Sequence, residues 1–88
     1  MKTMMSLHVY DDGVLAENYQ LELPKEALFL GKNDLIMVTS SHHFPVSQKR
    51  LNVEFKTMFV ISEIDRSEEE YCTYNKENLK RIGLTQID

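Results

Sequence analysis

The segment MSLHVYDDGVLAENYQLEL, residues 5–23, decides most of the fold expected for this 88-residue chain. Every second residue from Met5 to Val9 is apolar, and this period of two is typical of a half-buried β-strand. The alternation returns in the later part of residues 14–23. Asp11-Asp12-Gly13 lies between the two halves, and its glycine can adopt the positive φ angle of a tight turn. We therefore predict a β-hairpin of two long strands.

The residues after this hairpin predict a short helix and then a buried strand. Pro24 ends the second strand and fixes a φ angle suited to a first helical turn. Lys25–Leu30 contains good helix formers, and Gly31 is expected to end the helix in the left-handed conformation. Leu35–Val38 is a continuous apolar run, which favours a central strand with both faces covered.

The middle of the chain alternates between irregular and apolar segments. Thr39–Lys49 has no periodicity and contains Pro45, so we expect an exposed loop. Leu51–Ile64 reads as one long strand or a bent pair of strands. Asp65–Glu70 is expected to form a polar turn, and Tyr71–Tyr74 a last short strand.

The C-terminal segment carries the strongest helix signals. Asn75 is a good N-cap, Glu77 lies in the positively polarised first turn, and Arg81 lies in the negatively polarised last turn. Gly83 follows the helix, and Leu84 can close the C-cap by an apolar contact. We therefore predict a capped terminal helix that begins after Asn75.

Together these elements predict a single α+β domain, residues 1–88, that is mainly β. We expect a small curled antiparallel sheet or partly open β-barrel of about five strands, with one internal helical turn and the capped C-terminal helix. The core expected from the alternation consists of Leu7, Val9, Leu21, Leu35, Met37, Val53, Phe55, Phe59, Ile61 and Leu79.

Composition and charge limit the kinds of partner and compartment that we expect for this protein. The net charge is −4, which disfavours non-specific attraction to phosphate backbones or anionic lipid. The charge is uneven, because residues 35–62 are basic on balance and residues 63–77 are acidic. The single cysteine, Cys72, suits a reducing compartment. With no signal peptide or long apolar run, we expect a cytoplasmic protein without a membrane partner.

The sequence contains no recognisable catalytic or metal-binding spacing. The neighbours His42 and His43 point to opposite faces of an extended chain, so they cannot chelate one ion together. Cys72 is expected to be a buried, inert thiol. No glycine-rich phosphate loop or nucleophile elbow is present. We therefore expect no enzyme activity, no metal and no cofactor.

Two segments are candidate binding sites. The apparent loop at residues 42–50 mixes histidines, an aromatic ring and cations, a combination that can contact phosphate and stack on a base. The acidic run at residues 68–70 can face a basic protein surface. The candidate binding residues are His42, His43, Phe44, Lys49, Arg50, Glu68, Glu69 and Glu70.

The leading hypothesis is a non-catalytic regulatory or interaction module that binds another macromolecule, most readily a protein, through the segregated acidic and basic regions. The alternative is a small β-barrel regulator of transcription or translation that binds nucleic acid through the 42–50 loop. Association of the chain with itself is left open by the sequence.

Overall fold

The computed structural model describes residues 1–67 and 74–87, which form seven strands, one 3₁₀-helix and one α-helix. The predicted strand at Tyr71–Tyr74, together with Cys72 and Glu68–Glu70, lies wholly or largely outside these residues. In chain order the elements are β1 (Lys2–Asp11), β2 (Val14–Leu23), η1 (Lys25–Phe29), β3 (Leu35–Thr39), β4 (His42–Pro45), β5 (Gln48–Asn52), β6 (Thr57–Asp65), α1 (Lys76–Arg81) and β7 (Thr85–Ile87).

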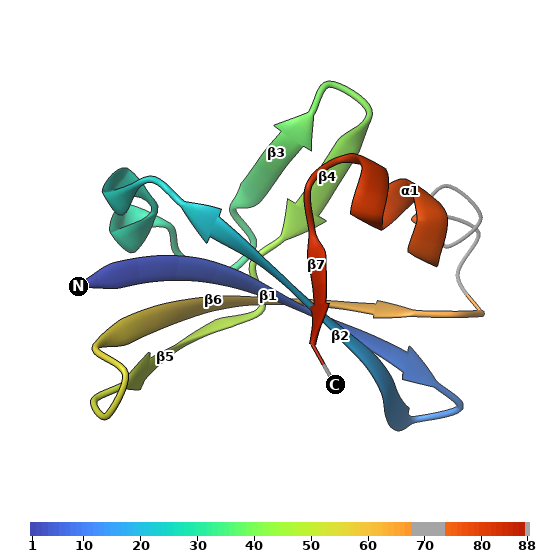
Figure 1. Cartoon of the computed structure of the whole chain (residues 1–88), viewed down its shortest axis with the longest axis horizontal. Helices are drawn as coiled ribbons and strands as arrows, with labels where there is room; N and C mark the ends of the chain where they lie inside the picture. Colours follow the sequence, from blue (N-terminus) through green and yellow to red (C-terminus); the bar gives the residue numbers. More distant parts are fainter. Residues whose placement is uncertain (68–73, 88) are drawn as a thin grey trace.

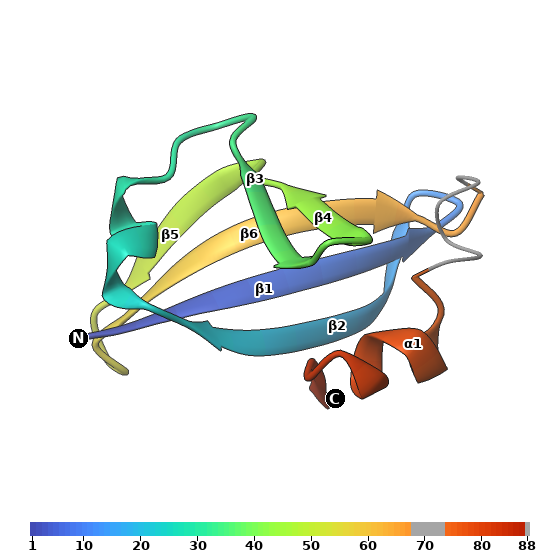
Figure 2. The same ribbon diagram turned by 90° about the horizontal axis from the view of Figure 1, so that it is seen from above.

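The described strands form one five-stranded sheet, in the order β5-β6-β1-β2-β7, and one two-stranded sheet of β3 and β4. The hairpin β3–β4 and α1 lie on the same side of the large sheet (Figure 1). Seen from above, the hairpin crosses over β1 and β6 (Figure 2). No described helix or strand covers the other side, so the large sheet has one covered face and one open face.

The predicted N-terminal hairpin is confirmed. β1 and β2 pair antiparallel from Thr3 opposite Leu23 to Asp11 opposite Val14. The connecting residues Asp12 and Gly13 have φ angles of 53° and 80°. Two consecutive positive φ angles are those of a type I′ turn, whose twist matches that of the flanking strands.

The expected antiparallel sheet is confirmed only in part, because β1 pairs with β6 in parallel and the five-stranded sheet is therefore mixed. In this register Met5 lies beside Val60 and Val9 beside Ile64, and all four side chains are buried. A parallel pair needs a long crossover connection, and here η1 and the β3–β4 hairpin form part of it. The crossover chain also covers one face of the sheet that it connects.

Leu35–Val38 is not a central strand. It forms most of β3, which pairs with β4 in the separate hairpin. Because this hairpin rests on the sheet with one side only, Ile36 is buried while Leu35 and Met37 are exposed. The expected burial of Leu35 and Met37 is therefore wrong.

The predicted loop at 39–49 is also wrong, since most of that segment belongs to β4 and β5. Of the two alternatives for Leu51–Ile64, the structure has a pair of strands, the end of β5 and most of β6, which a turn joins into an antiparallel hairpin. The Asn52 side-chain oxygen accepts a hydrogen bond from the backbone N–H of Phe55 in this turn. Val53 and Phe55 consequently project from the turn and are exposed, contrary to the predicted core.

The residues around η1 depart from the prediction in one detail. The short helix follows Pro24 as expected, but the chain leaves it at Leu30 in an extended conformation. Gly31 is therefore not a left-handed terminator. Asn33, with a φ angle of 75°, takes the positive conformation in the following turn.

The C-terminal helix and both of its caps are confirmed. Asn75 accepts a hydrogen bond of 3.1 Å from the backbone N–H of Asn78. Gly83 has a φ angle of 108°. The backbone N–H of Leu84 donates to the carbonyl of Leu79 at 3.0 Å, and both leucine side chains are buried. α1 has six residues, and no helix among the described residues has the length and apolarity needed to span a membrane.

The core lies between the covered face of the large sheet and the elements that rest on it. Of the predicted core residues, Leu7, Val9, Ile61 and Leu79 are buried, while Leu21 and Phe59 are only half-buried. The main cluster consists of Met5, Leu7, Val9, Tyr19, Ile36, Phe44, Val46, Val60, Ile64, Leu79 and Leu84.

Candidate functional site

The first three predicted binding residues lie on β4 and do not form one exposed site. His42 and Phe44 are buried, and both rings pack against the ring of Tyr74, at centroid distances of 5.3 and 5.1 Å. His43 faces outward, and its Nε2 lies 3.0 Å from the carbonyl of Ser40. Because side chains alternate along a strand, this segment offers one exposed imidazole rather than a cluster.

The two predicted cations lie on opposite faces of β5. Lys49 donates to the carbonyl of Leu28 at 3.0 Å, which holds its ammonium group near η1. Arg50 is paired with Phe59 of β6 and faces the open side of the large sheet. The structure therefore separates Lys49 from Arg50, and it describes none of Glu68, Glu69 and Glu70.

Arg50 belongs to a shallow hollow of about 350 Å³ on this open face. The hollow spans the strands in the order β5, β6, β1 and β2, so residues far apart in the chain meet there. Its lining consists of Ser6, His8, Asn18, Gln20, Arg50, Leu51, Asn52, Phe59 and Ile61. The floor combines aromatic and aliphatic carbon with hydroxyl, amide, imidazole and guanidinium groups.

A small hydrogen-bond network orders the centre of this hollow. The Ser6 hydroxyl donates to the Asn18 side-chain oxygen at 3.0 Å, and Nε2 of His8 lies 3.1 Å from the same hydroxyl. Because the hydroxyl proton points to Asn18, Nε2 of His8 is the donor to Ser6. The amide nitrogen of Asn18 and the side chain of Gln20 make no hydrogen bond within the described part of the chain. Both keep hydrogen-bonding capacity for a ligand.

The charge state of His8 follows from its surroundings. Partial burial lowers its pKa, the positive charge of Arg50 lowers it further, and Glu63 acts in the opposite direction. The ordinary histidine pKa is already below 7, so a lowered pKa keeps the imidazole neutral at that pH. A neutral imidazole has one donor and one acceptor nitrogen, which makes His8 a hydrogen-bonding group rather than a cation.

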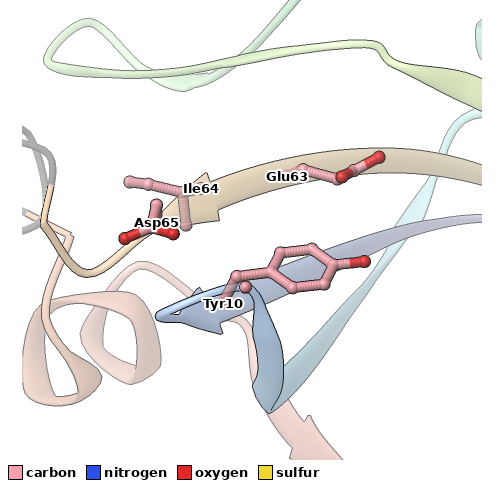
Figure 3. A pocket seen from close by; sticks show the side chains of 5 residues that line it. Tyr10, Glu63, Ile64 and Asp65 are labelled. Atoms are coloured by element: carbon pink, nitrogen blue, oxygen red, sulfur yellow. The ribbon is translucent and has the colours of Figure 1, made fainter.

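A second hollow, of about 270 Å³, lies further along β1 and β6 (Figure 3). It is lined by Tyr10, Gly13, Glu63, Ile64 and Asp65. Glu63 lies beside His8 and Asp65 beside Tyr10 in the parallel register. The rings of His8 and Tyr10 meet edge-on at 6.5 Å. The two hollows are therefore consecutive along one face, with Arg50 near one end and the carboxylates near the other.

Both carboxylates are held by neighbouring hydroxyl groups. Glu63 accepts a hydrogen bond of 3.0 Å from Ser47. Asp65 accepts hydrogen bonds from the backbone N–H and the hydroxyl of Ser67, and these bonds lower its pKa. A carboxyl with a lowered pKa stays ionised at neutral pH. This end of the face is therefore negative.

The Ser6–His8 pair is the nearest approach to a catalytic arrangement on this face. The Ser6 hydroxyl is buried and donates to Asn18 rather than to the histidine, so in this hydrogen-bond arrangement His8 is not placed to take its proton. Among residues 1–67 and 74–87, no three histidine, cysteine or acidic side chains are grouped so that they could hold a metal ion.

The chain matches no family model, no curated protein and no solved structure in the comparisons made with known proteins. The geometry of the open face therefore defines the candidate site. Its sequence signal is the polar side of the first hairpin, Ser6, His8 and Tyr10 with Asn18 and Gln20. These residues have hydroxyl, ring and amide side chains, which can form hydrogen bonds with a ligand.

Proposed function

We propose that this protein is a non-catalytic interaction module that binds an extended segment of another protein on the open face of its large sheet. The proposal rests on the difference between the two faces of the large sheet. One face is buried under the hairpin and α1, whereas the other lacks a covering element among the described residues and carries a hollow whose lining ranges from the buried Ser6 to the exposed Arg50.

The chemistry of the open face fits a polypeptide ligand. Asn18 and Gln20 can bond the N–H and C=O groups of a second chain, and Phe59 offers an apolar surface for its side chains. Arg50 comes from the basic region of the sequence and Glu63 from the acidic region. The segregated charges predicted from the sequence thus contribute to one surface, which supports a protein partner.

The nucleic-acid alternative has less support from this geometry. Its proposed loop is divided between two strands, with His42 and Phe44 in the core. On the open face the positive charge of Arg50 is accompanied by the negative charges of Glu63 and Asp65. Phosphate binding depends on several cations acting together, and carboxylates on the same surface oppose it.

Affinity capture tests the proposal when the wild-type protein is compared with a variant whose open face is blocked. Gln20→Arg places a long charged side chain in the hollow, and Gln20 makes no side-chain hydrogen bond within the described residues, so the fold should survive. Lys32→Glu changes an exposed residue outside the hollows and is the matched control. We expect one stoichiometric protein to be retained from native-cell extract by the wild type and by Lys32→Glu, and lost by Gln20→Arg.

The purified partner should then shift the amide NMR signals of Ser6, His8 and Phe59. Equal retention by the Gln20→Arg variant would place the binding surface elsewhere. Recovery of nucleic acid, with an affinity that falls steeply as salt is raised, would favour the alternative function instead.

A further inference from the structure

The charged side chains Arg50 and Glu63 lie at two different positions along the strands of the open face, and each position is called a level here. Arg50 lies opposite Phe59 in the β5–β6 register, and Glu63 lies four residues further along β6. A strand rises by about 3.3 Å per residue, so the two levels are about 13 Å apart. Three ion pairs occur among the described residues, and they use neither Arg50 nor Glu63. Both charges therefore remain available to a ligand.

An extended peptide ligand also covers about 13 Å in four residues. Side chains at positions i and i+4 of an extended chain also point to the same face. A ligand lying along β6 can thus place one side chain at the level of Arg50 and a second at the level of Glu63. Opposite charges at these positions complement the face, and like charges meet repulsion at one end.

From this juxtaposition we infer that the open face selects an extended protein segment with one acidic and one basic side chain four residues apart. The inference rests on the proposed function and adds the charge pattern of the ligand. The acidic side chain pairs with Arg50, and the basic side chain pairs with Glu63 beside the ring of Tyr10. The ring can add a cation–π contact to the ion pair.

A second copy of the chain fits the face less well than a peptide does. Two open faces packed about a two-fold axis would also bring Arg50 of each copy toward Glu63 of the other. Such packing would cover Ser6, Asn18 and Gln20 with another sheet face, whose side chains rather than backbone groups would have to satisfy them. Stable sheet-on-sheet interfaces are mainly apolar, so the polar centre favours the exposed backbone of an extended segment.

Synthetic peptides with defined charge spacing provide the test. The probe is a nine-residue peptide of serine and threonine that carries a glutamate and an arginine four residues apart. The comparison peptides carry the same two charges two residues apart, two glutamates, two arginines, or no charge. Each is titrated into the ¹⁵N-labelled full-length protein, and the dissociation constant is taken from amide shifts on the open face.

We expect the probe to bind about fivefold more tightly than either like-charged peptide, because a like-charged peptide keeps one exposed ion pair and exchanges the other for a repulsion. Arg50→Glu should transfer the preference to the two-arginine peptide, and Glu63→Arg should transfer it to the two-glutamate peptide. Lys32→Glu, which changes a charge outside the hollows, should leave the order of the peptides unchanged.

The possible failures are distinct. If all peptides shift the open-face amides with equal affinity, the inferred charge pattern is wrong and the proposed binding face stands. If no peptide shifts these amides, the inference is overturned, and the partner-capture experiment decides the proposed function separately. If sedimentation shows a dimer that Arg50→Glu and Glu63→Arg each abolish and their combination restores, the occupant is a second copy and the inference is likewise overturned.

Discussion

Phe44 and Phe55 have the opposite burial from the one that the sequence predicts. The difference between their contributions to the free energy of unfolding can be measured. Phe55 belongs to the predicted core but is 68% exposed, whereas Phe44 belongs to a predicted binding loop but is 2% exposed. A fully enclosed phenylalanine side chain buries about 200 Å². At about 25 cal/mol per Å², this burial stabilises the fold by up to about 5 kcal/mol. About a third of that amount remains for Phe55.

We therefore expect Phe44→Ala to lower the free energy of unfolding by about 4 kcal/mol, and Phe55→Ala by about 1 kcal/mol. The loss at Phe44 includes its contact with the Tyr74 ring, at a centroid distance of 5.1 Å. A chain of 88 residues has a total stability of about 4 to 13 kcal/mol. The larger loss is therefore enough to leave a marginally stable chain unfolded.

Urea denaturation followed by circular dichroism measures both variants. With a slope of about 1 kcal/mol per molar urea, the midpoint should fall by about 4 M for Phe44→Ala and about 1 M for Phe55→Ala. If Phe44→Ala is unfolded without urea, Phe44→Leu keeps most of the apolar volume and should cost about 1 kcal/mol. Equal losses for the two alanine variants would refute the assignment of β4 to the core.

Four further predictions concern α1 and the open face. Asn75→Ala removes the N-cap hydrogen bond and should cost about 1 kcal/mol in urea denaturation. Gly83→Val forces a β-branched residue to a φ angle of 108°, so its melting temperature should fall by more than that of the exposed-surface control Lys32→Glu. His8 has a lowered pKa, so its contribution to stability is present above the unfolded-state pKa near 6.5 and is lost as the pH falls through the folded-state pKa. His8→Gln should therefore weaken the loss of melting temperature between pH 7.5 and pH 5, and an unchanged pH dependence would contradict this. Arg50→Gln should raise the His8 pKa in an NMR titration, because it removes a positive charge near the imidazole.

The alternation of residues along the strands predicts only part of the open face. The alternation in the first hairpin predicts that Ser6 and His8 share the polar side of a strand, and the structure agrees. Nothing in the alternation predicts that Arg50 and Phe59 lie on the same surface, because that depends on the pairing of β5 with β6 and of β6 with β1. The residues of the predicted 42–50 site are divided between different faces for the same reason, since alternate residues of a strand point to opposite sides.

The sequence by itself determined the features whose atoms are neighbours along the chain. The turn at Asp12-Gly13 follows from the φ angles that those residues tolerate, and the caps of α1 follow from hydrogen bonds within a few residues of Asn75 and Leu84. Only the tertiary structure decided which apolar strand lies at the centre. Leu35–Val38 and Met58–Ile61 are similar apolar runs, and β-strand preference cannot separate them. The residues Met58–Ile61 became central because β6 pairs with β1 in parallel, while the crossover folds Leu35–Val38 onto one face of the sheet that this pairing creates.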